Sequence, residues 1–125
     1  MEQGMAFYLN VHEGPQNFNP TNIDVAVELG MITSIEPGIY RPGKHGVRIE
    51  NLVLTIPAEV NEFEAFYAFE TLTLAFIDTT LVDKDLLEAS HVTWLNNYNQ
   101  MVFEKLSPAL SADEAIWLKN KCRAI

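Results

Sequence analysis

The sequence predicts an α+β protein in which an antiparallel sheet is followed by C-terminal helices. Two observations support this fold class: the first part of the chain shows the apolar alternation of strands, and the last part shows the apolar spacing of helices. Strands and helices do not alternate along the chain, which disfavours a parallel sheet. We expect one domain over residues 1–125, with mainly strands in 1–80 and a helical extension in 81–125.

Composition and charge favour a globular chain and disfavour two classes of partner. The chain has 125 residues, of which 48% are apolar and 20% charged, and this suits one folded domain. A net charge of -9 disfavours nucleic acids and membranes as partners, because both need clustered Lys and Arg. No apolar run approaches the roughly twenty residues of a membrane span, and Cys122 is the lone cysteine, so we expect a soluble, cytoplasmic protein.

The centre of the chain predicts a tight hairpin. Residues 41–44 read Arg-Pro-Gly-Lys, in which proline sets φ at the second turn position and Gly43 accepts a positive φ at the third. Glu36 and Glu50 lie seven residues either side of Gly43. An antiparallel hairpin centred there would place the two carboxylates opposite each other on one face, with Cβ atoms about 5 Å apart.

Two facing carboxylates repel, so a folded chain needs a reason to keep them. They can lie in solvent or pair with Arg48, they can share a proton, or they can hold a cation. Apolar neighbours such as Ile35 and Ile49 argue against simple solvation. A one-residue bulge would turn one carboxylate to the other face, and the residues alone leave the three explanations open.

Strands and loops are predicted on both sides of the hairpin. Residues 6–12 are rich in aromatic and β-favouring residues and predict a short strand, whereas the Asn-rich residues 16–22 predict a loop. The second hairpin strand is expected to run through residues 53–56 and to end at Pro57. An acidic loop should follow, and alternating Leu and Thr predict a further strand over residues 66–77.

The last third of the chain changes to helical spacing. We expect a short helix at residues 85–89 and then a longer one that Ser90 caps and Ser107-Pro108 ends. Ser111 and Glu114 have the spacing of a capping box, which predicts a final helix. The expected apolar residues of the two long helices are Leu95, Tyr98, Val102 and Leu106, with Trp94 and Met101 beside them, and then Ala115, Leu118 and Cys122.

Several motifs follow one another along the chain. They are Leu-Asn-Val-His-Glu-Gly-Pro at residues 9–15, Gly-Met-Ile-Thr-Ser-Ile-Glu-Pro-Gly-Ile-Tyr at 30–40, Gly-Val-Arg-Ile-Glu-Asn at 46–51, Leu-Thr-Leu at 72–74 and Trp-Leu-Asn-Asn-Tyr at 94–98. Over almost its whole length the chain therefore resembles the aminopeptidase P family of Xaa-Pro aminopeptidases. The resemblance implies half of the pita-bread fold that this family shares with methionine aminopeptidases, prolidases and creatinases.

The resemblance implies roles for four residues. Glu36 falls on a glutamate that binds the metal pair and acts as a general base, and Glu50 falls on a bridging metal ligand. His12 falls on a catalytic histidine that contacts substrate, whereas the residues alone also allow a histidine bonded to a loop carbonyl. Arg48 resembles a substrate-site arginine, and charge balance for the glutamates is its alternative role. The implied cofactor is two divalent metal ions, for which oxygen and imidazole ligands favour manganese.

The chain also departs from the family pattern. A metal-binding histidine of the family falls on Gln3, and two aspartates and a further histidine of the family's site have no counterpart here. Two carboxylates out of a five-ligand set predict weak or absent metal binding and no peptidase activity from this chain alone.

We therefore expect a fragment of a metal-dependent aminopeptidase whose parent hydrolyses the bond between an N-terminal residue and proline in a peptide substrate. The alternative is a degenerate, non-catalytic homologue that binds proteins or peptides. Gln3 favours the alternative, whereas Glu36, Glu50 and His12 favour the enzyme. A half-sheet exposes apolar surface and an unpaired edge, so we also expect a homodimer or pairing with the missing half.

Overall fold

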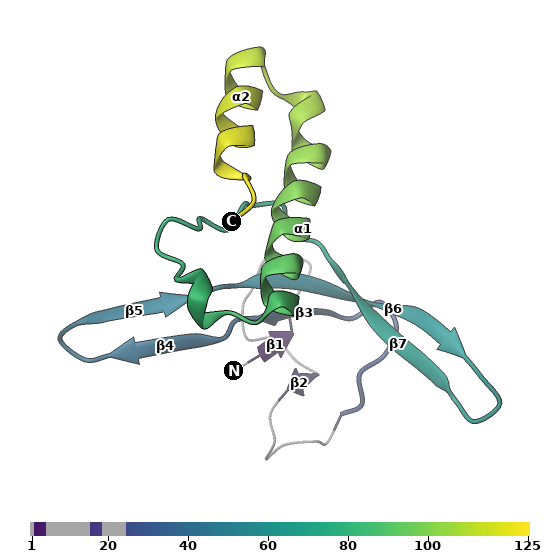
Figure 1. Ribbon diagram of the computed structural model, residues 1–125. Coiled ribbons are helices and arrows are strands. Elements are labelled where there is room, and N and C mark those ends of the chain that lie inside the picture. The colour runs from purple at the N-terminus through teal and green to yellow at the C-terminus, as the bar shows by residue number, and fades with distance from the viewer. Residues whose placement is uncertain (1, 5–15, 19–24) are drawn as a thin grey trace. The chain divides into compact units, whose positions relative to one another are not determined.

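The chain folds into two compact units, Met1–Thr73 and Leu74–Ile125. The computed structural model describes residues 2–4, 16–18 and 25–125 (Figure 1). The predicted strand at residues 6–12, and His12 with it, lies outside the described residues. In the part of the chain that is described, no helix is both long and apolar enough to cross a membrane.

Within the residues described, the first unit contains a five-stranded antiparallel sheet with the strand order β2-β1-β3-β6-β7. A two-stranded ribbon, made of β4 and β5, follows β3 and leads into β6 (Figure 1). The strands are β1 Glu2–Gly4, β2 Asn17–Phe18, β3 Ile32–Ile35, β4 Gly38–Arg41, β5 His45–Arg48, β6 Asn51–Val60 and β7 Ala65–Thr71. This antiparallel arrangement, with the helices after it, confirms the predicted fold class.

Strand β2 corrects the prediction of a loop over residues 16–22. Phe18 pairs with Glu2 and Asn17 pairs with Gln3, so the edge of β1 supplies backbone partners that the local sequence does not reveal. The neighbouring Gln16 is buried, and its side-chain amide donates a hydrogen bond of 2.9 Å to the carbonyl of Ile32.

Strand β6 runs through Pro57, so the prediction that it ends there is wrong. The N–H of Thr55 donates to the carbonyl of Met31 at 2.9 Å, and residue 57 directs its backbone nitrogen to the same side. Strand β3 begins at Ile32, which pairs with Leu54, and does not extend beside residue 57, so the missing proline N–H leaves no ladder bond unmade. On the other side Pro57 pairs with Tyr67, and the register shifts between Pro57 and Val60.

The hairpin that joins β6 to β7 is tighter than the sequence predicts. The side chain of Asn61 accepts hydrogen bonds from the backbone N–H groups of Phe63 and Glu64, at 3.0 and 3.1 Å. Strand β7 ends at Thr71, whereas the sequence predicts a strand to residue 77. The N–H of Leu52 donates to the hydroxyl of Thr73 at 2.8 Å and not to a backbone carbonyl. The ladder between β6 and β7 therefore stops there.

The second unit holds four helical segments: η1 Lys84–Leu86, α1 Ala89–Leu106, η2 Ser107–Ala109 and α2 Ala112–Lys121 (Figure 1). The predicted helix at residues 85–89 is only the short turn η1. Glu88 rather than Ser90 is the N-cap of α1, because the carbonyl of Glu88 already accepts the N–H of Val92 at 3.1 Å. The predicted end of α1 at Leu106 is confirmed.

The predicted capping box of α2 is also confirmed. The N–H of Ser111 donates to the Glu114 carboxylate at 2.9 Å, and the Ser111 hydroxyl accepts the N–H of Glu114 at 3.5 Å. The hydrogen bonds from Ser111 lower the pKa of Glu114 below its usual value. The buried cluster of this unit consists of Tyr98, Val102, Leu118 and Cys122.

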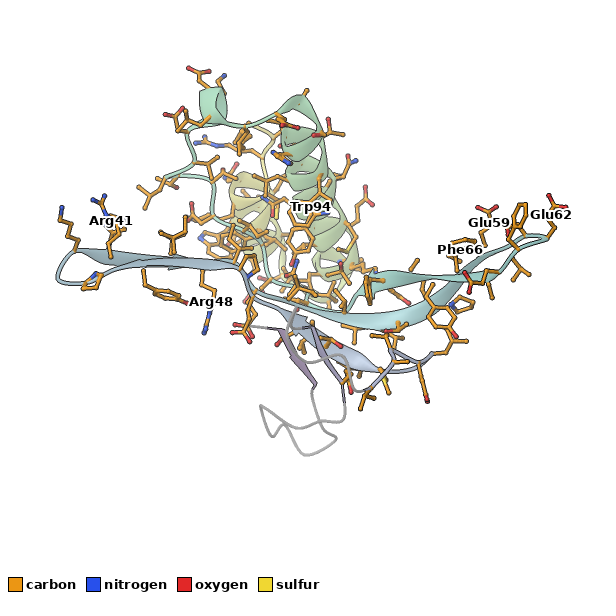
Figure 2. All side chains as sticks on the ribbon, turned by 90° about the horizontal axis from the view of Figure 1, so that it is seen from below. Arg41, Arg48, Glu59, Glu62, Phe66 and Trp94 are labelled. Carbon is orange, nitrogen blue, oxygen red and sulfur yellow. The ribbon has the colours of Figure 1, made fainter. Side chains whose placement is uncertain are left out.

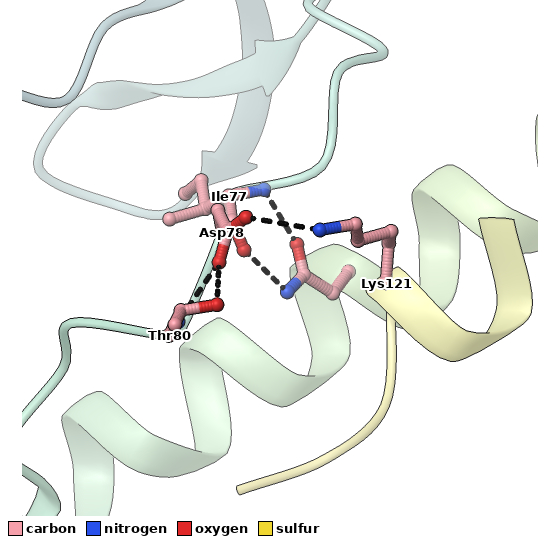
Figure 3. A network of polar contacts seen from close by, with 5 residues as sticks. Ile77, Asp78, Thr80 and Lys121 are labelled. Carbon is pink, nitrogen blue, oxygen red and sulfur yellow. Dashed lines mark hydrogen bonds and ion pairs between the residues drawn. The ribbon is translucent and has the colours of Figure 1, made fainter. Parts of the chain in front are cut away.

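An extended segment after Leu74 is held to α1 by side chains. The buried amide of Asn99 accepts the N–H of Ile77 at 2.9 Å and donates to the carbonyl of Ile77 at 3.0 Å. Next to these two hydrogen bonds, Asp78 accepts hydrogen bonds from Thr80 and forms an ion pair with Lys121 at 3.4 Å (Figure 3). The hydrogen bonds from Thr80, helped by Lys121, lower the pKa of Asp78 to about 2.

Candidate functional site

Glu36 and Glu50 lie opposite each other where the sheet continues into the β4–β5 ribbon. The ladder of β3 with β6 and the ladder of β4 with β5 share one register, so no bulge separates them at these residues. Between the two ladders, the N–H of Ile49 also donates a hydrogen bond of 3.3 Å to the carbonyl of Pro37. The opposed pairs are Ile35 with Asn51, Pro37 with Ile49, and Gly38 with Arg48.

The turn that sets this register forms as the sequence predicts. Gly43 has a φ of 69°, and the N–H of Lys44 donates to the carbonyl of Arg41 at 3.0 Å. Because the pair at Pro37 and Ile49 is hydrogen-bonded, the next pair is a non-hydrogen-bonded one, in which the Cα atoms approach to about 4.5 Å. The side chains of such a pair share one face of the ribbon.

Arg48 joins the two carboxylates. Its Nη1 lies 3.0 Å from Oε2 of Glu36, and its Nε lies 3.4 Å from Oε2 of Glu50. The second oxygen of Glu36, Oε1, accepts a hydrogen bond of 3.2 Å from the hydroxyl of Ser34. The Glu36 side chain is 14% exposed and that of Glu50 is 43% exposed. Of the three explanations for the facing carboxylates, the structure therefore shows the pairing with Arg48.

Tyr40 occupies the same face of the ribbon and was missed by the sequence reasoning. A Cβ atom on Gly46 would lie 2.8 Å from Cδ1 of Tyr40, and one on Gly38 would lie 2.8 Å from its hydroxyl. The two glycines therefore leave the space that the ring fills, and the hydroxyl reaches the residue that pairs with Arg48. Gly46 pairs with Tyr40 across the ribbon, and Gly38 lies two residues before it on the same strand. This pattern of glycines around the tyrosine is the sequence signal that could have revealed the packing.

The residues described do not fit a pair of metal ions. Within residues 2–4, 16–18 and 25–125, no group of three or more His, Cys, Asp or Glu side chains could hold a metal. Glu36 and Glu50 are brought together, but Arg48 lies between them. Two carboxylates are too few ligands for two divalent ions. The backbone of Gln3 pairs with Ser34, which puts β1 beside the strand that leads to Glu36.

Comparison with known families matches almost the whole chain. Residues 3–57 match metallopeptidase family M24, and residues 65–125 match the C-terminal region of peptidase M24. Together the two matches contain most of the sheet, the ribbon and both long helices.

Individual relatives carry consistent names. The chain is 38% identical to Xaa-Pro aminopeptidase app-1 from Caenorhabditis elegans, 42% to aminopeptidase P2 from Arabidopsis thaliana and 37% to human Xaa-Pro aminopeptidase 2. These alignments cover 94% to 98% of this chain but only 18% to 21% of the relatives. The chain therefore spans about a fifth of the length of the curated relatives it matches.

A solved structure shows the same fold. The X-prolyl aminopeptidase from C. elegans, described as a cytosolic enzyme with a di-nuclear active site, matches with a TM-score of 0.85 and 37% sequence identity. The match covers 99% of this chain and 21% of that structure. Sequence motifs, family matches and fold agree. The chain belongs to the aminopeptidase P family of metallopeptidases and corresponds to one part of such a protein.

Proposed function

We propose that this chain is the part of a metal-dependent Xaa-Pro aminopeptidase that supplies two carboxylates to the active site, and that it is inactive alone. The observation that supports this is the placement of Glu36 and Glu50 on one face with Arg48 between them. The fold that carries this pair matches an X-prolyl aminopeptidase with a di-nuclear active site.

The surroundings of the two glutamates favour different roles. Glu36 is the less exposed carboxylate and is oriented by Ser34 and Arg48, which suits a proton acceptor that must be held in place. Glu50 is more exposed and has only one oxygen engaged by Arg48, which suits a ligand that is completed by groups from outside this chain. We assign Arg48 and His12 to the binding of the peptide substrate, with His12 contacting the scissile bond.

The assembled enzyme would require residues beyond those described here. We propose two divalent metal ions for it, and manganese suits a site of oxygen and imidazole ligands. Its substrate would be a peptide with proline at the second position, in line with the names of the relatives. We also propose a cytoplasmic location, because the C. elegans structure is described as that of a cytosolic enzyme.

Pairing with the remainder of such a domain, or with a second copy of this chain, stays a prediction. Side chains of the β6–β7 hairpin favour it, because large apolar groups there are exposed to solvent (Figure 2). These groups are Val60, Phe63, Phe66, Tyr67 and Phe69.

A chimera tests the proposed function. This chain replaces the matching segment of the C. elegans Xaa-Pro aminopeptidase, once as it stands and once with Gln3→His, and cleavage of an Xaa-Pro peptide is measured. The 125-residue chain alone should show no cleavage. We expect the Gln3→His chimera to be active and the chimera with Gln3 to be about 100-fold slower, since an imidazole binds such metals better than an amide.

The same experiment separates the enzyme from the non-catalytic alternative, which Gln3 favours. The unmodified C. elegans enzyme is the reference for activity and metal content. A Gln3→His chimera that folds and takes up metal like this reference, yet cleaves no Xaa-Pro peptide, would support the degenerate binding module. Equal cleavage rates with Gln and with His at position 3 would show that Gln3 does not mark a loss of peptidase activity.

A further inference from the structure

We propose that this chain associates with a second copy of itself by inserting the tip of the β6–β7 hairpin of one copy into a pocket of the second unit of the other. The tip consists of residues 59–64, and Phe63 is its apolar centre. Two cations of the pocket, Lys119 and Arg123, form no ion pair among the described residues. None of these residues belongs to the candidate carboxylate site, so the inference goes beyond the proposed function and does not depend on it.

The hairpin tip presents apolar side chains on a turn that is held in place. Val60 and Phe63 are 80% and 84% exposed, more than any other large apolar side chain in the described part of the first unit. The N–H groups of Phe63 and Glu64 donate to the side chain of Asn61, whose own N–H donates to the carbonyl of Glu64 at 3.1 Å. An exposed aromatic ring on such a turn suits an anchor in an interface, because its backbone is already ordered before binding.

The same hairpin carries negative charge only. Residues 51–71 contain four Glu and no Lys or Arg. Glu59, Glu62 and Glu64 belong to the tip, where Figure 2 shows the first two, and none of the three forms an ion pair among the described residues. Two tips would therefore repel each other, so the charge disfavours a contact between tips and favours a positively charged partner surface.

A pocket of the second unit offers such a surface. It has a volume of about 410 Å³ and is lined by residues of α1, of α2 and of the segment that follows α2. Phe103 and the buried Cys122 give it an apolar wall, and Lys119 and Arg123 give it positive charge. No Asp or Glu is among its lining residues. A pocket of this size and character can receive one aromatic side chain that has carboxylates beside it.

The two surfaces are complementary, and both belong to this chain. Phe63 of one copy would enter the pocket of the second copy, where Glu62 and Glu64 would pair with Lys119 and Arg123. The distribution of charge along the chain favours a second copy as the partner, because the acidic hairpin lies in the first unit and most cations lie in the second. Of the eight Lys and Arg residues, five lie after residue 80: Lys84, Lys105, Lys119, Lys121 and Arg123.

Sedimentation velocity of the full 125-residue chain, from about 1 µM to about 1 mM, tests the proposal. The sedimentation coefficient should rise with concentration. Phe63→Ser should raise the dissociation constant about thirtyfold, because it removes the aromatic anchor. Leu81→Ser is the matched control, since Leu81 is 96% exposed and belongs to neither the tip nor the pocket lining. It should leave the dissociation constant unchanged.

Reversal of charge identifies the two surfaces. Glu62→Lys with Glu64→Lys makes the tip positive, and Lys119→Glu with Arg123→Glu makes the pocket negative. Each double variant should be a monomer by itself, because its tip and its pocket then have the same sign of charge. An equal mixture of the two should associate again, since each tip finds a pocket of opposite charge on the other variant. Recovery in the mixture also shows that both variants are folded.

Three results would overturn the inference. A chain that stays monomeric over the whole range would leave the remaining part of the domain, rather than a second copy, to cover the tip. Equal dissociation constants for Phe63→Ser and Leu81→Ser would place the contact elsewhere. So would a mixture that stays monomeric while both charge variants keep the circular dichroism spectrum of the wild type. If either of them loses that spectrum, the comparison of the two serine variants decides. The chimera with the C. elegans enzyme reports on catalysis in every case.

Discussion

Replacing Glu36 with Gln in the active Gln3→His chimera should lower kcat for Xaa-Pro cleavage by about a thousandfold. Glutamine keeps the size of the side chain and can still accept the hydrogen bond from Ser34, but it cannot take a proton from water. General base catalysis contributes about 10² to 10⁴ in rate, so most of the activity should disappear while the fold is kept. The measurement is kcat for a peptide with proline at the second position.

Glu59→Gln is the matched control for this change. Glu59 is an exposed residue of β6 near the β6–β7 turn. Figure 2 shows it near the tip of the β6–β7 hairpin, well away from Arg48. Its substitution removes the same charge and should leave kcat unchanged. If the chimera with Glu36→Gln kept a tenth or more of its activity, Glu36 would not be the proton acceptor.

Asn99→Ala should lower the free energy of unfolding of the second unit by about 2 to 4 kcal/mol. The amide of Asn99 is 1% exposed and satisfies both the N–H and the carbonyl of Ile77. Each buried backbone group left without a partner costs about 1 to 3 kcal/mol. Both tryptophans, Trp94 and Trp117, belong to this unit, so their fluorescence during urea unfolding follows it.

Asn97→Ala provides the comparison for Asn99→Ala. Asn97 lies on the same helix, α1, but is exposed. Its substitution should change the unfolding free energy by less than about 0.5 kcal/mol. An equal loss in both variants would contradict the assignment of the effect of Asn99→Ala to its bonds with Ile77, because alanine is a better helix former than asparagine and the substitution itself does not weaken the helix.

Local signals in the sequence predict the helices better than the strands. The capping box of Ser111 and Glu114 and the end of α1 before Ser107-Pro108 depend on neighbours within a few residues, and both are confirmed. Strand ends depend instead on partners far along the chain. Strand β6 passes Pro57 because β3 begins opposite Leu54 and does not extend beside the proline. Strand β7 ends early because the Thr73 hydroxyl accepts the N–H of Leu52.

The candidate site shows the same division. The carboxylate pair is predictable because one tight turn at Gly43 fixes the register for every residue that follows on both strands. Ser34 is not predictable in the same way, since the sequence does not show which rotamer brings its hydroxyl to Glu36. For Tyr40 the sequence signal is limited to the glycines at positions 38 and 46. The backbone pairing of Gln3 with Ser34 is likewise not predictable, because it joins β1 to β3, a strand far along the chain.

The most direct test of the account is whether residues 36 and 50 face each other on one side of the ribbon. In a Cys122→Ala background, Glu36→Cys with Glu50→Cys should form a disulfide readily, because Cα atoms about 4.5 Å apart suit that bond. Glu36→Cys with Ile49→Cys places the thiols on opposite faces and should stay reduced. Oxidation of the second pair but not the first would show a register shifted by one residue and would contradict the shared carboxylate site.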